Sequence, residues 1–272
     1  MRYLTRILPL FIFCFAPTIW AEQLPANTAI ASAHPLATLA GREILDQGGN
    51  AFDAAIAVAS VLAVVEPYNS GLGGGGFFLL HRARDGRQVM LDAREKAPLA
   101  ARRDMYLDEK GKANAQASLV GPLAAAIPGL PAGLVHLSKR YGRMPLQQSL
   151  SAAIRLAEAG FPVDARYCAV AESQLTHLQA HPETAKQFLN DTRVPKVGDL
   201  LKQPRLAATL RALAQQGNAG FYRGPVARAM VGAVRAQGGI WTQADFSRYQ
   251  VKERAPISFP YRGLKVVSAA PP

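Results

Sequence analysis

Residues 69–98 read NSGLGGGGFFLLHRARDGRQVMLDAREKAP and decide the front half of the fold. Within this stretch, a run of glycines precedes two apolar segments, residues 77–82 and residues 88–93. The dipeptide Asp85-Gly86 separates the two segments, and Asp-Gly between apolar runs is typical of a tight hairpin turn. The stretch therefore predicts a glycine-rich loop that leads directly into an antiparallel β-hairpin.

The glycine run formally contains the pattern G-x-G-x-x-G at Gly71, Gly73 and Gly76. In nucleotide-binding folds that pattern follows a strand and opens a helix, so that phosphate lies at the helix N-terminus. Here the order is reversed, because a helical segment precedes the glycines and a strand follows them. Residues without a Cβ instead allow two backbones, or a backbone and a ligand, to approach closely. We interpret the run as a tight packing element.

Outside this stretch, apolar residues recur at intervals near 3.6, which is typical of amphipathic helices. The predicted helices cover residues 35–45, 51–65, 130–141, 146–159, 206–215 and 226–237. A short strand is predicted at residues 28–33, and another begins at residues 264–267 with no partner in view. Together these elements predict an α/β (α+β) fold.

The N-terminus has the features of an export signal. Arg2 and Arg6 give a positive start, residues 7–16 are almost wholly apolar, and a cut is expected after Ala21. A membrane anchor fits less well, because a spanning helix needs roughly 20 apolar residues. We predict a cleaved signal peptide over residues 1–21 and a mature protein that is periplasmic or secreted. No stable membrane span is expected after the signal is removed.

The formal net charge of the chain is +12. A basic surface can attract anions, membranes or nucleic acid. The cations are scattered along this sequence, however, and no aromatic residues interleave with them as platforms for stacked bases. We therefore interpret the charge as a solvated surface and expect no nucleic-acid partner.

Few residues of this chain suit a nucleophile or a metal. Cys14 lies in the signal, where the residue before it fits lipoprotein cleavage poorly, so Cys168 is the single thiol of the mature chain. It has no base nearby in the sequence and is expected to be a buried small hydrophobe. His177 and His181 share a helical spacing, but Leu178 stands where the zinc motif H-E-x-x-H requires glutamate. We expect no metal and no cofactor.

The segment DAREKAP, residues 92–98, holds the strongest candidate for ligand binding. It follows the predicted hairpin, which places Arg94 at the end of a strand. A guanidinium there can bind a carboxylate through two parallel hydrogen bonds, with Asp92 or Glu95 orienting it. The alternative is a structural ion pair, because exposed pairs between arginine and acidic residues are common and weak.

Several motifs occur in a specific order along the mature chain. They are GGNAFDAA at 48–55, SGLGGGGF at 70–77, DAREKAP at 92–98, GFYRG at 220–224 and GGIWT at 238–242. In these motifs and their spacing the chain resembles the front part of a γ-glutamyltranspeptidase, an enzyme of the N-terminal-nucleophile hydrolase class. The resemblance covers nearly the whole mature sequence. It implies a four-layer αββα sandwich, of which this chain supplies an incomplete part.

The resemblance also implies a reaction. Enzymes of this family are exported precursors that cut themselves before a threonine, which becomes the N-terminus of a small subunit. The threonine hydroxyl attacks the γ-glutamyl amide of glutathione, with its own α-amine as base, and the glutamyl group passes to water or an amino acid. The arginine of the DAREKAP motif binds the α-carboxylate of the substrate. By resemblance, that substrate-binding role is assigned to Arg94.

The sequence departs from the family pattern at its end. The catalytic threonine is expected beyond Pro272, so residues 22–272 are expected to form the N-terminal part of the large subunit. We predict that this chain alone is inactive, and that its partner is the small subunit of the same precursor. Two alternatives stay open. One is a related amidohydrolase acting on a β-lactam side chain or poly-γ-glutamate, and the other is a non-catalytic exported fragment that binds γ-glutamyl compounds.

Overall fold

The computed structural model describes residues 28–271. The expected signal peptide, residues 1–21, lies outside these residues, so cleavage after Ala21 stays a prediction. Ala31–Pro272 forms one compact unit, which is described below. Within the described part of the chain, no helix is long and apolar enough to cross a membrane.

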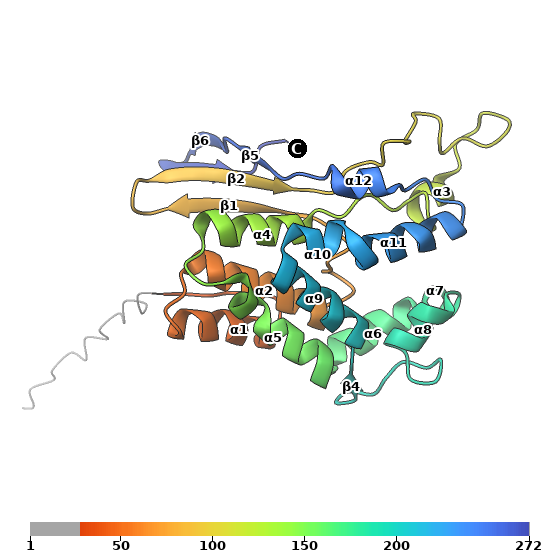
Figure 1. The fold of residues 1–272 in the computed structure, drawn as a ribbon, viewed down its shortest axis with the longest axis horizontal. Coiled ribbons are helices and arrows are strands. Elements are labelled where there is room, and N and C mark those ends of the chain that lie inside the picture. The colour runs from red at the N-terminus through yellow and green to blue at the C-terminus, as the bar shows by residue number, and fades with distance from the viewer. Residues whose placement is uncertain (1–27, 272) are drawn as a thin grey trace, which may run out of the picture. The chain divides into compact units, whose positions relative to one another are not determined.

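The compact unit contains both helices and strands (Figure 1). The helices are α1 (Pro35–Asp46), α2 (Ala51–Val65), α3 (Ala115–Leu119), α4 (Leu130–Tyr141), α5 (Leu146–Ala159), α6 (Ala165–Ser173), α7 (Leu175–Gln179), α8 (Pro182–Phe188), α9 (Pro204–Gln216), α10 (Asn218–Tyr222), α11 (Gly224–Ala236) and α12 (Gln243–Ser247). The strands are β1 (Gly76–Arg82), β2 (Arg87–Ala93), β3 (Phe161–Pro162), β4 (Leu200–Leu201), β5 (Lys252–Arg254), β6 (Ile257–Tyr261) and β7 (Leu264–Ser268). The predicted mixed α/β fold is confirmed, as are the six helices expected from the apolar periodicity.

The hairpin predicted from the Asp85-Gly86 dipeptide is present as β1 and β2. The two strands pair antiparallel, from Gly76 opposite Ala93 to Arg82 opposite Arg87. Gly86 takes a φ of 66°, a left-handed conformation that glycine adopts without steric cost. On its other edge β2 pairs antiparallel with β5, which gives a three-stranded sheet in the order β1-β2-β5.

Helices cover one face of this sheet (Figure 1). α4 contacts β2 on one side and α2 on the other, while α2 also contacts α1 and α5. The start of α2 is fixed by a capping box, in which the Asn50 side chain accepts from the amide of Asp53 and the Asp53 carboxylate accepts from the amide of Asn50. Asp53 is fully buried and also accepts from the amide of Arg143, so one carboxylate ties α2 to the loop after α4.

The predicted strand at residues 28–33 is wrong, because the structure has no strand there. Strands need a paired neighbour, and side chains in this segment hydrogen-bond locally instead. Ser32 Oγ lies 3.0 Å from the carbonyl oxygen of His34, to which it donates, and 2.8 Å from Thr38 Oγ1. These contacts lead the chain into α1.

The strand that begins at residue 264 does have a partner, contrary to the expectation from sequence. It is β7, which pairs antiparallel with β6 from Ile257 opposite Ser268 to Tyr261 opposite Leu264. Arg262 and Gly263 make the turn with positive φ values of 49° and 78°. β6 was not expected from the sequence, because Pro260 lies within it and proline cannot donate to a ladder.

Candidate substrate-binding site

Arg94 follows β2 directly, as the sequence predicted. β2 is the middle strand of the sheet, so both of its edges are hydrogen-bonded and its end is held in place. Gly133 of α4 lies against Ala93 and Phe78, which therefore face the helices. Because side chains alternate along a strand, Asp92 points to the opposite face of the sheet. The candidate site thus lies at the end of β2, on the side away from α4.

Two glycines allow the backbone at the end of β2 to be packed on both sides. A Cβ on Gly75 would lie 2.6 Å from the carbonyl oxygen of Ala93 and 2.7 Å from the amide nitrogen of Glu95. A Cβ on Gly129 would lie 2.1 Å from the same carbonyl oxygen. The amide of Gly129 also donates to the carbonyl of Gly74 at 2.9 Å. The interpretation of the glycine run as a packing element is confirmed at Gly75, where a Cβ would collide with backbone atoms.

Asp92 binds the main chain of Arg94 and not its guanidinium. One carboxylate oxygen accepts from the Arg94 amide at 3.0 Å, and the other accepts from Arg254 Nε at 2.8 Å. Burial opposes the charge of Asp92, but the Arg94 amide and the Arg254 guanidinium outweigh it, so the pKa of this carboxyl lies below its ordinary value. Asp92 is therefore a charged group that organises the end of the strand.

The Arg94 side chain is 61% exposed. Its Nε lies 3.7 Å from a Glu95 carboxylate oxygen, and its guanidinium carbon lies 6.0 Å from the centre of the Phe77 ring. Of the two acids expected to orient the guanidinium, only Glu95 contacts it, and at a distance typical of a weak exposed pair. Arg94 therefore keeps hydrogen-bond donors free for another anion.

A cavity of about 230 Å³ lies beside this arginine. Its lining has four cationic side chains, two acidic ones and one amide, and they are Arg94, Lys96, Lys252, Arg254, Asp92, Glu95 and Gln250. Lys96 Nζ donates to the carbonyl of Gln250 at 3.0 Å, and Arg254 is paired with Asp92. The excess of positive charge suits a carboxylate ligand.

The contributions of β5 and of the segment before it were not expected from the sequence. Lys252 and Arg254 reach the cavity because β5 pairs with β2, and no local pattern in the sequence indicates that pairing. Tyr249 was also missed, although its hydroxyl donates to the Arg94 carbonyl at 2.7 Å. The one signal available in the sequence was Asp92, an aspartate inside an otherwise apolar strand. A buried carboxylate requires a partner, so Asp92 indicated that a donor such as Arg254 lies nearby.

The other sequence candidates lie away from this cavity. The Cys168 thiol donates to the Pro195 carbonyl at 3.2 Å. Its pKa is raised, mainly by burial and further by the negative charges of Asp164 and Asp199. Cys168 is half-buried and not fully buried as expected, and a thiol with a raised pKa is not activated. His177 and His181 line a different, mostly apolar cavity of about 550 Å³. Among the described residues, no group of three or more metal-ligating side chains is present.

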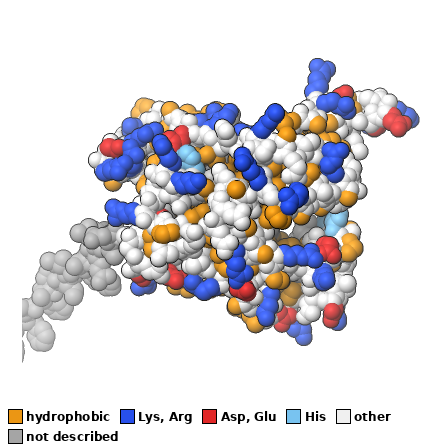
Figure 2. All heavy atoms as spheres, in the orientation of Figure 1, with side chains coloured by type: hydrophobic (Ala, Val, Ile, Leu, Met, Phe, Trp, Pro, Cys, Tyr) orange, Lys and Arg blue, Asp and Glu red, His pale blue; other side chains and the backbone are white. Residues whose placement is uncertain are grey.

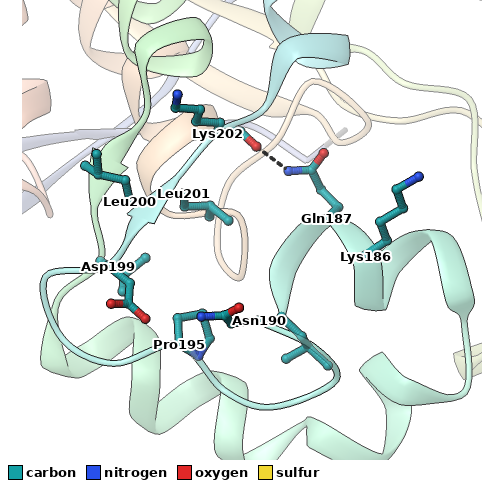
Figure 3. Close-up of a pocket in the computed structure, with 10 residues that line it drawn as sticks. Lys186, Gln187, Asn190, Pro195, Asp199, Leu200, Leu201 and Lys202 are labelled. Carbon is teal, nitrogen blue, oxygen red and sulfur yellow. Dashed lines mark hydrogen bonds between the residues drawn. The ribbon is translucent and has the colours of Figure 1, made fainter.

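A further cavity, of about 410 Å³, lies between α8 and β4 (Figure 3). In it, Gln187 Nε2 donates to the carbonyl of Lys202 at 2.7 Å, while the Lys186 side chain points away. No residue of the segment 92–98 lines this cavity. Figure 2 shows lysines and arginines dispersed over the visible face, without a continuous basic stripe.

The fold has a counterpart among solved structures. It matches the crystal structure of Helicobacter pylori gamma-glutamyltranspeptidase with a TM-score of 0.87 and 39% sequence identity, covering 90% of this chain and 71% of that chain. The arrangement of helices and sheet is thus that of a mixed α/β protein that matches part of a transpeptidase structure.

Residues 37–272 match the family described as gamma-glutamyltranspeptidase. The chain belongs to the gamma-glutamyltranspeptidase family. It is 41% identical over 260 residues to the glutathione hydrolase proenzyme of Pseudomonas sp. (strain A14). The aligned region covers 93% of this chain and 44% of that protein. It is 37% identical over 260 residues to the acylase ACY 1 proenzyme of Pseudomonas sp. (strain V22), covering 92% of this chain and 46% of that protein. The chain therefore spans less than half the length of these two curated relatives.

Proposed function

We propose that the whole protein transfers γ-glutamyl groups from glutathione and related compounds to water or amino acids. The observation that carries this proposal is the geometry of Arg94, whose guanidinium is largely free while its main chain is fixed at the end of β2. Membership of the family and the similarity to a glutathione hydrolase proenzyme support the same reaction.

In this proposal Arg94 binds the α-carboxylate of the γ-glutamyl group. The planar guanidinium can give two parallel hydrogen bonds to a carboxylate, which fixes both distance and orientation. Substrate competes with Glu95 for the guanidinium, and a 3.7 Å exposed contact is readily replaced. Fixing the carboxylate end sets where the γ-amide carbon lies, which is how binding contributes to the reaction rate.

The reacting atom is proposed to come from a threonine that this chain does not supply. By resemblance, the threonine hydroxyl attacks the γ-amide carbon, its α-amine takes the proton, and backbone N–H groups stabilise the oxyanion. We propose accordingly that the chain alone is inactive and that a small subunit from the same precursor completes the site. Export to the periplasm or the medium belongs to the same proposal.

The finer architecture is part of the proposal too. In a four-layer αββα sandwich, the sheet face away from α4 would pack against a second sheet. Phe77 and Leu79 on that face are 39% and 47% exposed, which supports a further layer there, because large apolar side chains rarely stay uncovered together.

The proposal is tested by expressing this chain and, separately, the reading frame extended with the DNA downstream of Pro272. We expect the extended protein to release the anilide from a γ-glutamyl anilide and the chain alone to release none. Arg94→Met should raise KM at least about a hundredfold, because a charged bidentate contact is lost. Arg155→Met, which removes an exposed guanidinium paired with Glu43, is the matched control. Turnover by the chain alone would overturn the inactivity claim, and an unchanged KM in Arg94→Met would overturn the role of Arg94.

A second candidate is acyl transfer from another amide, favoured by the similarity to the acylase ACY 1 proenzyme. Such a substrate need not carry a carboxylate in its acyl group, and without one Arg94 has no ligand. Comparing a γ-glutamyl anilide with a β-lactam acylated by butyrate, whose acyl group has no carboxylate, separates the two candidates. Preference for the β-lactam, with no effect of Arg94→Met on it, would favour the acylase.

A further inference from the structure

The main chain of Arg94 is held from both sides, by the neighbouring Asp92 and by Tyr249, which lies far away in the sequence. Its amide donates to Asp92 Oδ1 at 3.0 Å, and its carbonyl oxygen accepts from the Tyr249 hydroxyl at 2.7 Å. The Arg94 side chain itself has only the weak contact with Glu95 and a 6.0 Å approach to the centre of the Phe77 ring. The direction of the guanidinium is therefore set largely by how firmly this peptide is held.

Arg254 acts on the first of these two contacts. It lies on β5 opposite Met90 and donates through Nε to Asp92 Oδ2 at 2.8 Å. The Arg254 side chain is 31% exposed and that of Asp92 is 9% exposed, so this charge-assisted bond is partly shielded from water. One oxygen of Asp92 is occupied by Arg254, which leaves the other aimed at the Arg94 amide.

Tyr249 acts on the second contact from a rigid position. Its side chain is 7% exposed, and its ring stacks on Tyr222 with centroids 5.4 Å apart and planes 6° apart. The Tyr222 hydroxyl is itself fixed, because it donates to the Pro128 carbonyl at 2.9 Å. A Cβ on Gly129 would lie 2.2 Å from the Tyr249 hydroxyl, so glycine leaves the space that this hydroxyl fills.

Tyr249 also stays a donor. Burial raises the pKa of its hydroxyl, and the carboxylates of Asp92 and Glu95 raise it further. A neutral phenol beside two carboxylates keeps its proton and directs it to the Arg94 carbonyl. Asp92 thus affects both the amide and the carbonyl of Arg94. It accepts a hydrogen bond from the amide, and its charge keeps the proton on the Tyr249 hydroxyl that donates to the carbonyl.

We infer that Arg254 and Tyr249 are positioning residues for Arg94, which fix its peptide and thereby aim its guanidinium at a substrate carboxylate. This inference rests on the proposed function for the identity of the ligand. Neither residue needs to touch the substrate. Long flexible side chains bind with specificity only where their base is held by surrounding contacts.

The first test measures hydrogen exchange of the Arg94 amide in the chain and needs no substrate. In Arg254→Met we expect exchange about tenfold faster, because the carboxylate that caps the amide loses its charged partner. Arg254→Lys should restore part of the protection. Tyr249→Phe should speed exchange about threefold, as one neutral hydrogen bond is lost. Arg155→Met and Tyr167→Phe are the matched controls, and both should leave the Arg94 amide unchanged. Arg155 is paired with Glu43, and the Tyr167 hydroxyl donates to the Phe188 carbonyl at 2.7 Å.

The second test uses the extended protein and compares a γ-glutamyl anilide with the 4-aminobutyryl anilide, which lacks the α-carboxylate. We expect Arg254→Met to reduce the preference for the γ-glutamyl compound about tenfold, mainly through KM, while turnover of the other anilide stays the same. A merely structural role would slow both substrates equally.

The two tests fail separately. Unchanged Arg94 exchange in a folded Arg254→Met chain would overturn the inference, whatever the activity. Equal losses on both anilides would overturn it as well. If the extended wild-type protein cleaves no γ-glutamyl compound, the proposed function fails, and the exchange result alone then decides whether Arg254 and Tyr249 hold the Arg94 peptide.

Discussion

The two faces of the β1-β2-β5 sheet are built from alternate residues of the same strands, yet they differ in cover. Toward α4, Leu91 and Ala93 are completely buried and Leu80 is 6% exposed. On the opposite face, Phe77 is 39% exposed and Leu79 is 47% exposed. On β1 a one-residue step thus separates sealed core from open surface, whereas on β2 Met90, which lies on the same face as Leu79, is completely buried beside Ala270.

The two faces contribute differently, one to the stability of the chain and the other to the candidate binding site. The helix-facing residues pack at interior density and tolerate little change in volume. The opposite face holds the charged residues Asp92, Lys252 and Arg254, which line the cavity beside Arg94. The same strand pairing that buries Leu91 also fixes the end of β2, so the sealed face supports the geometry of the open one.

The largest expected effect tests the sealed face. Leu91→Ala removes a fully buried side chain and should lower the free energy of unfolding by about 3 kcal/mol, since a cavity is left behind. The matched change Leu79→Ala, on the open face, should cost less than about 1 kcal/mol. Urea unfolding of the two variants measures both values. Equal losses would contradict the division between the two faces.

The second test targets the tight packing beside β2. Gly75→Ala places a Cβ 2.6 Å from a backbone oxygen, and we expect a loss of about 2 kcal/mol because backbone cannot yield cheaply. Gly73→Ala is the control, since a Cβ there meets nothing within 4 Å. Thermal unfolding distinguishes them. A destabilised Gly73→Ala would indicate that the whole loop, and not one glycine, is constrained.

The third test follows acid stability on the open face. The Arg94 amide and the Arg254 guanidinium lower the pKa of Asp92 in spite of its burial. In the hairpin turn, a hydrogen bond with Arg82 lowers the pKa of the exposed Asp85 to about 2. Both pKa values lie below the unfolded value of about 3.9, so the stabilisation is present above that pH and is lost as pH falls through the folded pKa. We expect Asp92→Asn to cost about 1 kcal/mol at neutral pH and to flatten the acid dependence of unfolding. Asp85→Asn should change stability less, and the reverse order would contradict the importance of burial.

The smallest effect on stability is expected in the hairpin of β6 and β7. Phe259 is 47% exposed, so Phe259→Ser should change the free energy of unfolding by less than about 0.5 kcal/mol. It should nevertheless reduce self-association of the chain, because exposed apolar strands invite edge-to-edge pairing. Light scattering across a concentration series measures this. Arg262→Ser, at the turn, is the control for a polar change nearby.

Some of this molecule could be predicted from local sequence because the physical cause is local. The Asp85-Gly86 turn, the capping Asn50 and the apolar periodicity of α2 each act within a few residues. The same holds for Arg94, whose place at a strand end follows from the hairpin. The expected strand at 28–33 fails for the complementary reason, since a strand requires a partner that its own sequence does not specify.

The rest depended on contacts between distant segments. Arg254 reaches Asp92 only because β5 pairs with β2, and Tyr249 reaches the Arg94 carbonyl only because Gly129 leaves room for its hydroxyl. By itself, the sequence determined the hairpin, the main helices and the arginine at the strand end, since short-range sterics and periodicity set them. Only the tertiary structure decided which face of the sheet is sealed and which side chains hold the Arg94 peptide, because pairing and close packing join residues more than 150 positions apart.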